Sequence, residues 1–199
     1  MGIAQPINSA ARVVPAWSLY ILLLIPGALL LWQVLTNPGP NPVETLEHGL
    51  GEDALKILIL GLLITPVRDL FKVNLIKFRR AIGLMAFFYV LAHLLVYLFL
   101  DKQLDWGPII KDVTKRPYII VGVLSFLILL PLAVTSNNLS IRKLGPVVWR
   151  KPHWWVYAAA LLGAAHFVML KKTWQAEPLI YFAVFAVLVG YRGWKSVRA

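Results

Sequence analysis

Two histidines, His93 and His166, lie inside apolar stretches that are long enough to cross a lipid bilayer, at residues 81–100 and 152–170. An ionisable side chain at bilayer depth is energetically costly and therefore marks a candidate functional site. Two imidazoles at equal depth on different helices can bind one haem iron from opposite sides. We therefore expect a haem site between these two stretches.

The depths of the two histidines are predicted to match. At a helical rise of about 1.5 Å per residue, His93 lies roughly 20 Å from Arg80, and His166 lies roughly 20 Å from Pro152. Both rings then reach the outer half of the bilayer. Hydrogen bonds from each histidine to a neighbouring helix are the alternative. Tyr89 and Tyr97 are candidate hydrogen-bond donors near His93 or neighbours of the haem propionates, and an interfacial aromatic belt explains Tyr97 at least as well.

The composition indicates that much of the surface faces lipid. Hydrophobic residues make up 59% of the 199 residues and charged residues 15%, and the mean hydropathy is +0.72. Soluble domains contain about 25% charged residues. Apolar runs close to the length of a spanning helix recur at residues 17–35, 55–70, 81–100, 117–135, 152–170 and 178–194. We predict one all-α domain over residues 1–199, a bundle of six transmembrane helices.

The second of these runs gives the weakest signal. Lys56 opens it and Arg68 and Asp69 close it, so its uncharged part is short and relies on long side chains reaching the interface. The six-span topology depends on this run crossing the membrane.

The distribution of charge predicts the orientation. With six spans, one face carries most of the cationic residues, namely Arg12, Arg68, Lys72, Lys77, Arg79, Arg80, Arg142, Lys143, Arg150, Lys151, Arg192, Lys195 and Arg198. The opposite face carries every acidic residue except Asp69, beside Lys56, Lys102, Lys111, Lys115, Arg116, Lys171 and Lys172. The positive-inside rule then places both termini in the cytoplasm. The net charge of +11 thus indicates topology and contact with anionic lipid, and it does not indicate nucleic-acid binding.

The chain contains no cysteine, which excludes disulfides, thiolate-held iron–sulfur clusters and thioether-attached haem from it. No glycine-rich phosphate loop and no Ser/His/Asp order is recognisable. The sequence therefore supplies no catalytic motif, and any redox cofactor must be held by other ligands.

The remaining histidines are ambiguous. His153 follows Pro152, which suits the first position of a helix, so geometry favours a surface histidine about 20 Å below His166. His48 lies in a predicted outer loop at residues 41–49. This loop could cover the outer haem edge or dock a periplasmic partner, although its spacing alone favours a plain polar loop.

Three arginines, Arg68, Arg79 and Arg80, are predicted at the cytoplasmic rim. A guanidinium there can pair with haem propionates, a flavin phosphate or a quinone carbonyl. Anchoring to lipid headgroups explains the same residues equally well.

Several motifs in order along nearly the whole chain resemble the MsrQ (YedZ) family of ferric-reductase-like membrane subunits. They comprise residues 41–49, Thr65-Pro66-Val67-Arg68, Arg79-Arg80 with Gly83-Leu84, Lys115-Arg116-Pro117-Tyr118, Thr135-Ser136, Trp149, His153, Tyr157 and His166. The resemblance implies a six-helix b-type cytochrome of the bacterial inner membrane that is itself non-catalytic. Its electrons would come from the quinone pool or a cytoplasmic flavin reductase. They would pass to MsrP, a periplasmic molybdenum-containing reductase that repairs methionine sulfoxide in envelope proteins.

The resemblance also implies FMN besides haem b, and it matches His93, His153 and His166 to the haem-associated histidines of the family. It thus favours a second haem at His153, although Pro152 replaces the usual leucine before that histidine. Two other functions stay open, a small transporter or proton channel that uses a histidine relay and a haem-free anchor for a periplasmic reductase. The acidic residues lie in loops or at the ends of the spans, so a relay would have few intermediate groups.

Overall fold

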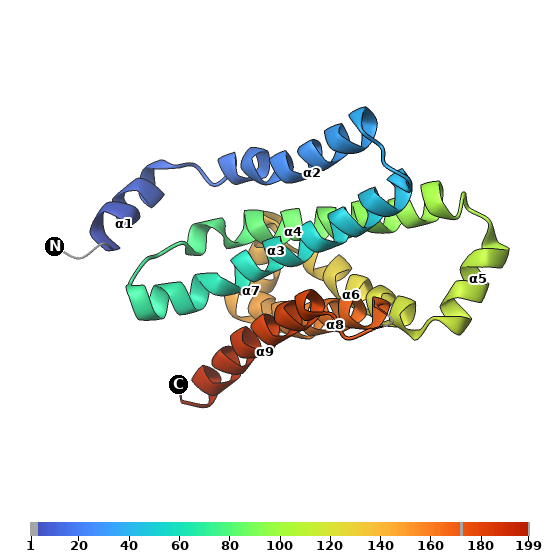
Figure 1. The fold of residues 1–199 in the computed structure, drawn as a ribbon. Helices are drawn as coiled ribbons and strands as arrows, with labels where there is room; N and C mark the ends of the chain where they lie inside the picture. Colours follow the sequence, from blue (N-terminus) through green and yellow to red (C-terminus); the bar gives the residue numbers. More distant parts are fainter. Residues whose placement is uncertain (1–3, 172, 199) are drawn as a thin grey trace.

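A computed structural model describes residues 4–171 and 173–198, and within these ranges the chain is helical without any strand (Figure 1). Lys172, which the charge pattern assigns to the outer face, lies outside the described residues. The elements are α1 (Ala4–Val13), α2 (Ser18–Thr36), α3 (Pro42–Phe71), η1 (Ile76–Phe78), α4 (Arg79–Leu95), η2 (Val96–Asp101), α5 (Trp106–Lys115), α6 (Pro117–Val134), α7 (Asn138–His153), α8 (Trp155–Leu170) and α9 (Ala176–Val197).

Five helical segments of the described chain are long and apolar enough to cross a membrane: Ser18–Thr36, Ile76–Asp101, Pro117–Val134, Asn138–Leu170 and Ala176–Val197. They contain five of the predicted runs and confirm an all-α, polytopic membrane protein. The remaining run lies within α3, which is not among the five because charged residues close both ends of its apolar part.

Helix α3 lies inside the bundle. It packs most extensively against α4, while α6 packs most extensively against α8. Figure 1 shows α2 lying along the outside of the α3–α4 pair. Leu55, Leu58 and Ile64 of α3 are buried, whereas α2 has no buried residue. The interior position explains how α3 combines a charged first half with an apolar second half.

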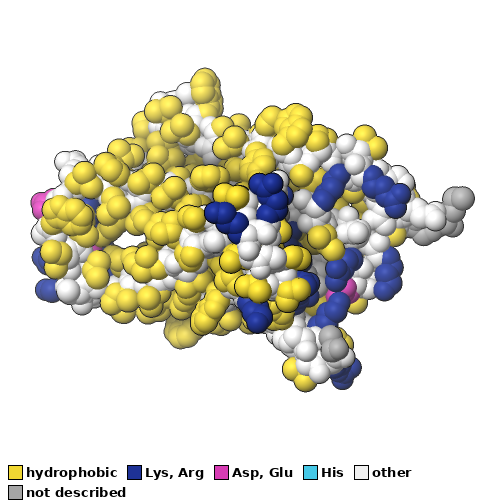
Figure 2. Space-filling model, turned by 180° about the vertical axis from the view of Figure 1, so that it is seen from behind, with side chains coloured by type: hydrophobic (Ala, Val, Ile, Leu, Met, Phe, Trp, Pro, Cys, Tyr) yellow, Lys and Arg dark blue, Asp and Glu magenta, His cyan; other side chains and the backbone are white. Residues whose placement is uncertain are grey.

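Figure 2 shows a surface of mostly hydrophobic side chains, with Lys and Arg gathered toward the end where α1 lies. Such a surface suits a chain whose middle contacts lipid and whose basic loops meet the headgroups.

Several helical segments were not expected from the apolar runs. Helices α1, α5 and α7 are short or polar, so a search for apolar runs cannot detect them. Residues 42–49, which we expected in a loop, form the first turns of α3, with Pro42 at a helix start where its missing N–H costs nothing. Helix α7 is kinked at Gly145, whose φ of 74° suits glycine.

The tyrosine Tyr89 joins α4 to α2. Its hydroxyl donates a hydrogen bond to the Leu23 carbonyl (2.7 Å) and accepts one from the Gly27 N–H (2.8 Å). In an uninterrupted helix these two backbone groups would bond to each other. The hydroxyl is thus inserted into α2 beside Pro26. Our expectation that Tyr89 donates a hydrogen bond near His93 is wrong, because its hydroxyl bonds to the backbone of α2.

We expect Tyr89→Phe to destabilise the protein by about 1–3 kcal/mol, because two backbone groups lose their partner in an apolar setting. The measurement is the Tm of the detergent-solubilised protein. Tyr20→Phe is the matched control, since the Tyr20 hydroxyl makes no hydrogen bond to any residue the structure describes. Equal Tm values for the two variants would contradict the inserted hydroxyl.

Candidate functional site

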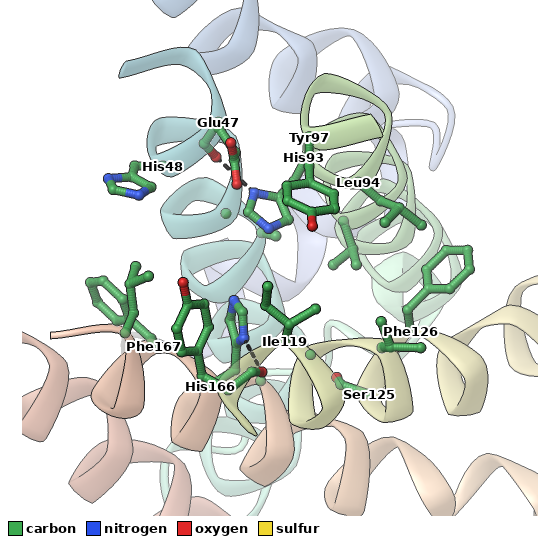
Figure 3. A pocket seen from close by; sticks show the side chains of 18 of the residues that line it. Glu47, His48, His93, Leu94, Tyr97, Ile119, Ser125, Phe126, His166 and Phe167 are labelled. Atoms are coloured by element: carbon green, nitrogen blue, oxygen red, sulfur yellow. Dashed lines mark hydrogen bonds between the residues drawn. The ribbon is translucent and has the colours of Figure 1, made fainter. Parts of the chain in front are cut away.

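A cavity of about 590 Å³ lies among α3, α4, η2, α5, α6 and α8 (Figure 3). This volume is in the range of cofactor sites. The lining is mainly apolar at one end of the cavity and polar at the other. The apolar end is formed by Leu58, Val90, Phe126 and Gly163, and the polar end by Glu47, His48, Lys102 and Arg116.

The two central histidines face each other across this cavity. His93 comes from α4 and His166 from α8, and Figure 3 shows their rings pointing toward one another. The ring centroids are 6.2 Å apart and the ring planes meet at 79°. The fold therefore brings together the pair that the apolar runs placed at a common depth.

Backbone carbonyls fix the orientation of both rings. The Nδ1 atom of His93 bonds the Glu47 carbonyl (2.8 Å), and that of His166 bonds the Tyr118 carbonyl (2.7 Å). Because a carbonyl only accepts, each Nδ1 carries the proton and each Nε2 keeps its lone pair. Neither Nε2 makes a hydrogen bond to the described residues. This is the arrangement of a metal-binding histidine whose other nitrogen is held by a carbonyl.

The spacing of the rings fits a metal ion bound between them. Two imidazoles that bind one metal from opposite sides, each with a bond of about 2 Å, have ring centroids about 6 Å apart. The distance between His93 and His166 meets this requirement without movement of either helix. The residues present thus fit a haem iron with two histidine ligands.

Two glycines make room for the rings, and the sequence analysis did not single them out. A Cβ at Gly122 would lie 2.8 Å from Nδ1 of His166, and one at Gly51 would lie 3.3 Å from Nδ1 of His93. Both lie in helices, where glycine is unfavourable relative to alanine. A glycine inside a predicted helix can indicate close packing. Only the tertiary structure shows that the packed groups are the two histidine rings.

The polar end of the cavity is organised around Asp112, which is buried. Its carboxylate contacts Nζ of Lys102 (3.0 Å) and Nε of Arg116 (3.3 Å), and the Tyr97 hydroxyl donates to it (3.4 Å). The hydrogen bond from Lys102 to Asp101 raises the pKa of that lysine, as does the bond to Asp112. A hydrogen bond to the Tyr118 hydroxyl raises the pKa of Arg116. Both cations therefore stay charged.

The carboxyl group of Glu47 also lines the polar end. Burial, reinforced by the nearby Asp101 carboxylate, raises the pKa of Glu47 to about 7. This side chain is thus partly protonated near pH 7, which reduces the negative charge at the polar end.

The other predicted site residues lie in different places. His48 lines the polar end of the cavity, whereas the three arginines do not line the cavity. Arg68 pairs with Asp69 (3.3 Å), Arg79 donates to the Thr65 hydroxyl (2.6 Å), and Arg80 donates to Oδ1 of the Asn138 side chain (2.7 Å).

The third candidate ligand, His153, lies outside the cavity. Its ring stacks on Trp149 with centroids 3.9 Å apart. Its Nδ1 bonds the Trp149 carbonyl (2.8 Å), and its Nε2 lies 3.4 Å from the Ser136 hydroxyl. Our expectation that Pro152 begins a helix is wrong, because Pro152 and His153 end α7 and the next helix begins at Trp155.

Comparison with known proteins agrees with this architecture. The model of the family described as "Ferric reductase like transmembrane component" matches residues 51–164, a range that includes His93 and ends two residues before His166. The chain is 51% identical over 177 residues to the "Protein-methionine-sulfoxide reductase heme-binding subunit MsrQ" of Agrobacterium fabrum, which covers 88% of this chain and 82% of the relative. It is 46% identical over 177 residues to the protein of the same description from Brucella ovis, covering 88% and 80%.

The fold and the matching family model define a ferric-reductase-like transmembrane protein. Within this class, the chain belongs to the MsrQ family. The resemblance found in the sequence is thereby confirmed, as is the prediction of a multi-pass protein of the bacterial inner membrane.

Proposed function

We propose that this chain is the haem-binding, electron-carrying membrane subunit of a methionine-sulfoxide reductase system. The observation that carries the proposal is the pair of facing imidazoles, His93 and His166, whose centroids lie 6.2 Å apart with both Nδ1 atoms held by carbonyls. The relatives whose printed descriptions name a heme-binding subunit support the choice of ligand.

The side chains of His93 and His166 would hold one haem b through Nε2. When bound, this group supplies a site that accepts and releases one electron at a depth where an isolated charge is otherwise unstable. The carbonyls of Glu47 and Tyr118 keep the imidazoles in the binding tautomer. Apolar side chains such as Leu58 and Phe126 exclude water from the inner part of the cavity.

We further propose that residues 1–199 form a single domain with six spans and both termini in the cytoplasm, α3 providing the second span. Its burial among apolar helices supports this topology despite its charged ends. The polar end of the cavity then faces the periplasm, where the electron acceptor MsrP would dock near His48.

Electrons would enter from the cytoplasmic side, from quinone or a flavin reductase. The proposal of FMN rests on the family resemblance, and Arg68, Arg79 and Arg80 remain candidate contacts for such a donor or for lipid. The stacked and hydrogen-bonded position of His153 favours a structural role over a second haem.

Absorption spectra of the purified protein, oxidised and dithionite-reduced, test the proposal. We expect a b-type Soret band that shifts on reduction, a sharp α band and one haem per chain. A colourless protein from haem-replete cells would contradict the proposal. If that protein still bound the reductase, the haem-free anchor would be correct, and pH-dependent flux in liposomes would instead identify a proton channel.

A further inference from the structure

Three cations line the cavity, namely Lys102, Arg116 and Lys171, and the proposed function does not yet use them. Lys102 and Arg116 both line the cavity, and the buried Asp112 carboxylate holds them 3.0 Å and 3.3 Å away. Lys102 follows η2, Asp112 lies in α5 and Arg116 precedes α6. One carboxylate therefore fixes two cations from separate elements at the same mouth of the cavity.

Both cations retain donors for a ligand. The ammonium of Lys102 has three N–H donors, of which Asp101 and Asp112 engage two. The guanidinium of Arg116 uses Nε for Asp112 and Nη1 for the Tyr118 hydroxyl, and Nη2 makes no hydrogen bond to the described residues. Asp112 thus positions both side chains, and each of them keeps N–H donors that can bind a ligand.

Most carboxylates near Lys102 and Arg116 already have a hydrogen-bond or ion-pair partner. Glu44 accepts a hydrogen bond from Asn41 (3.1 Å), and Glu52 pairs with Lys56 (3.9 Å). Asp101 and Asp112 both pair with Lys102 (2.8 Å and 3.0 Å). An anionic group that enters the polar end therefore meets less repulsion than the number of acidic residues suggests.

The polarity gradient of the cavity selects one ligand orientation. The apolar end, near Leu58 and Phe126, suits the hydrocarbon body of a flat ligand, whereas the polar end suits its anionic groups. Arg68, Arg79 and Arg80, which we predicted from the sequence as candidates to bind anionic groups, do not line this cavity.

We infer that Lys102 and Arg116, braced by Asp112, form a carboxylate-binding subsite that takes the propionate groups of the haem held by His93 and His166. The inference rests on the proposed function. Charge-assisted hydrogen bonds of this kind are stronger than neutral ones, and Nη2 of Arg116 is available to donate one.

The test compares two ligands that differ only at the carboxylates. The full-length chain is purified from haem-depleted cells and titrated in detergent with haem b and with haem dimethyl ester, in which both propionates are neutral. We expect the wild type to bind haem b about 10–100-fold more tightly than the ester, in line with the strength of hydrogen bonds to charged groups. In Lys102→Gln/Arg116→Gln, haem b affinity should fall to that of the ester.

The ester also reports the integrity of the cavity, because its affinity should be the same in the variant as in the wild type. Lys111→Gln is the matched control, since Lys111 lies on α5 but does not line the cavity. Equal wild-type affinities for the two ligands, or an equal loss of both in the double variant, would overturn the subsite alone. A wild type that binds neither ligand would overturn the proposed function and the subsite together.

Discussion

Replacing either facing histidine should remove the b-type spectrum. In His93→Ala or His166→Ala we expect haem content to fall by more than the factor of about 10–100 that loss of an outer-shell contact alone causes in metal sites. The physical reason is that each ring supplies one of the two facing Nε2 atoms, so either replacement leaves the iron with a single histidine from this pair. Haem content per chain, from the pyridine haemochrome, is the measurement.

The control for this result is His153→Ala. Its ring stacks on Trp149 outside the cavity, so we expect haem content close to that of the wild type. A similar loss in all three variants would contradict the assignment of the ligands to His93 and His166. It would favour instead the second haem that the family resemblance implies.

Gly122→Ala should displace His166 and weaken haem binding by about 10–100-fold, as expected when the support of a metal ligand is disturbed. The added Cβ would lie 2.8 Å from Nδ1 and 3.0 Å from Cε1 of the ring, so the imidazole must move. Its movement would also weaken the hydrogen bond to the Tyr118 carbonyl. We expect Gly51→Ala to have a smaller effect, because its closest contact is 3.3 Å.

Binding of carbon monoxide to the reduced protein gives an independent measurement of this displacement. If both histidines bind the haem iron firmly, no coordination position is left for carbon monoxide. If one histidine is displaced, carbon monoxide can take its position. We therefore expect Gly122→Ala to bind carbon monoxide and the wild type not to bind it.

Gly83→Ala is the matched control for Gly122→Ala, because nothing lies within 4 Å of its added Cβ. It should leave haem content unchanged and increase stability by about 0.5–1 kcal/mol, the usual gain from alanine in a helix. Wild-type haem binding and no carbon monoxide binding in Gly122→Ala would show that the ring is not confined as the structure indicates.

Much of the architecture was predictable because lipid imposes a simple rule on sequence. Backbone polar groups must be satisfied within each span, so long apolar runs correspond to helices. This rule located α2, α4 with η2, α6, α8 and α9. It did not locate α1, α5 and α7, whose polar residues meet water or headgroups and obey no such constraint. It was also weakest for α3, because packing between helices, and not hydropathy, explains its position.

The sequence by itself predicted that His93 and His166 lie at a similar depth, because helical rise converts residue number into height. Rotation about each helix axis and the choice of neighbouring helix depend on contacts between distant residues, so only the tertiary structure decided that the two rings face each other. The same reason applies to the carbonyls of Glu47 and Tyr118, to the space beside Gly51 and Gly122, and to the Asp112 brace. Each of these contacts joins segments that no local pattern relates.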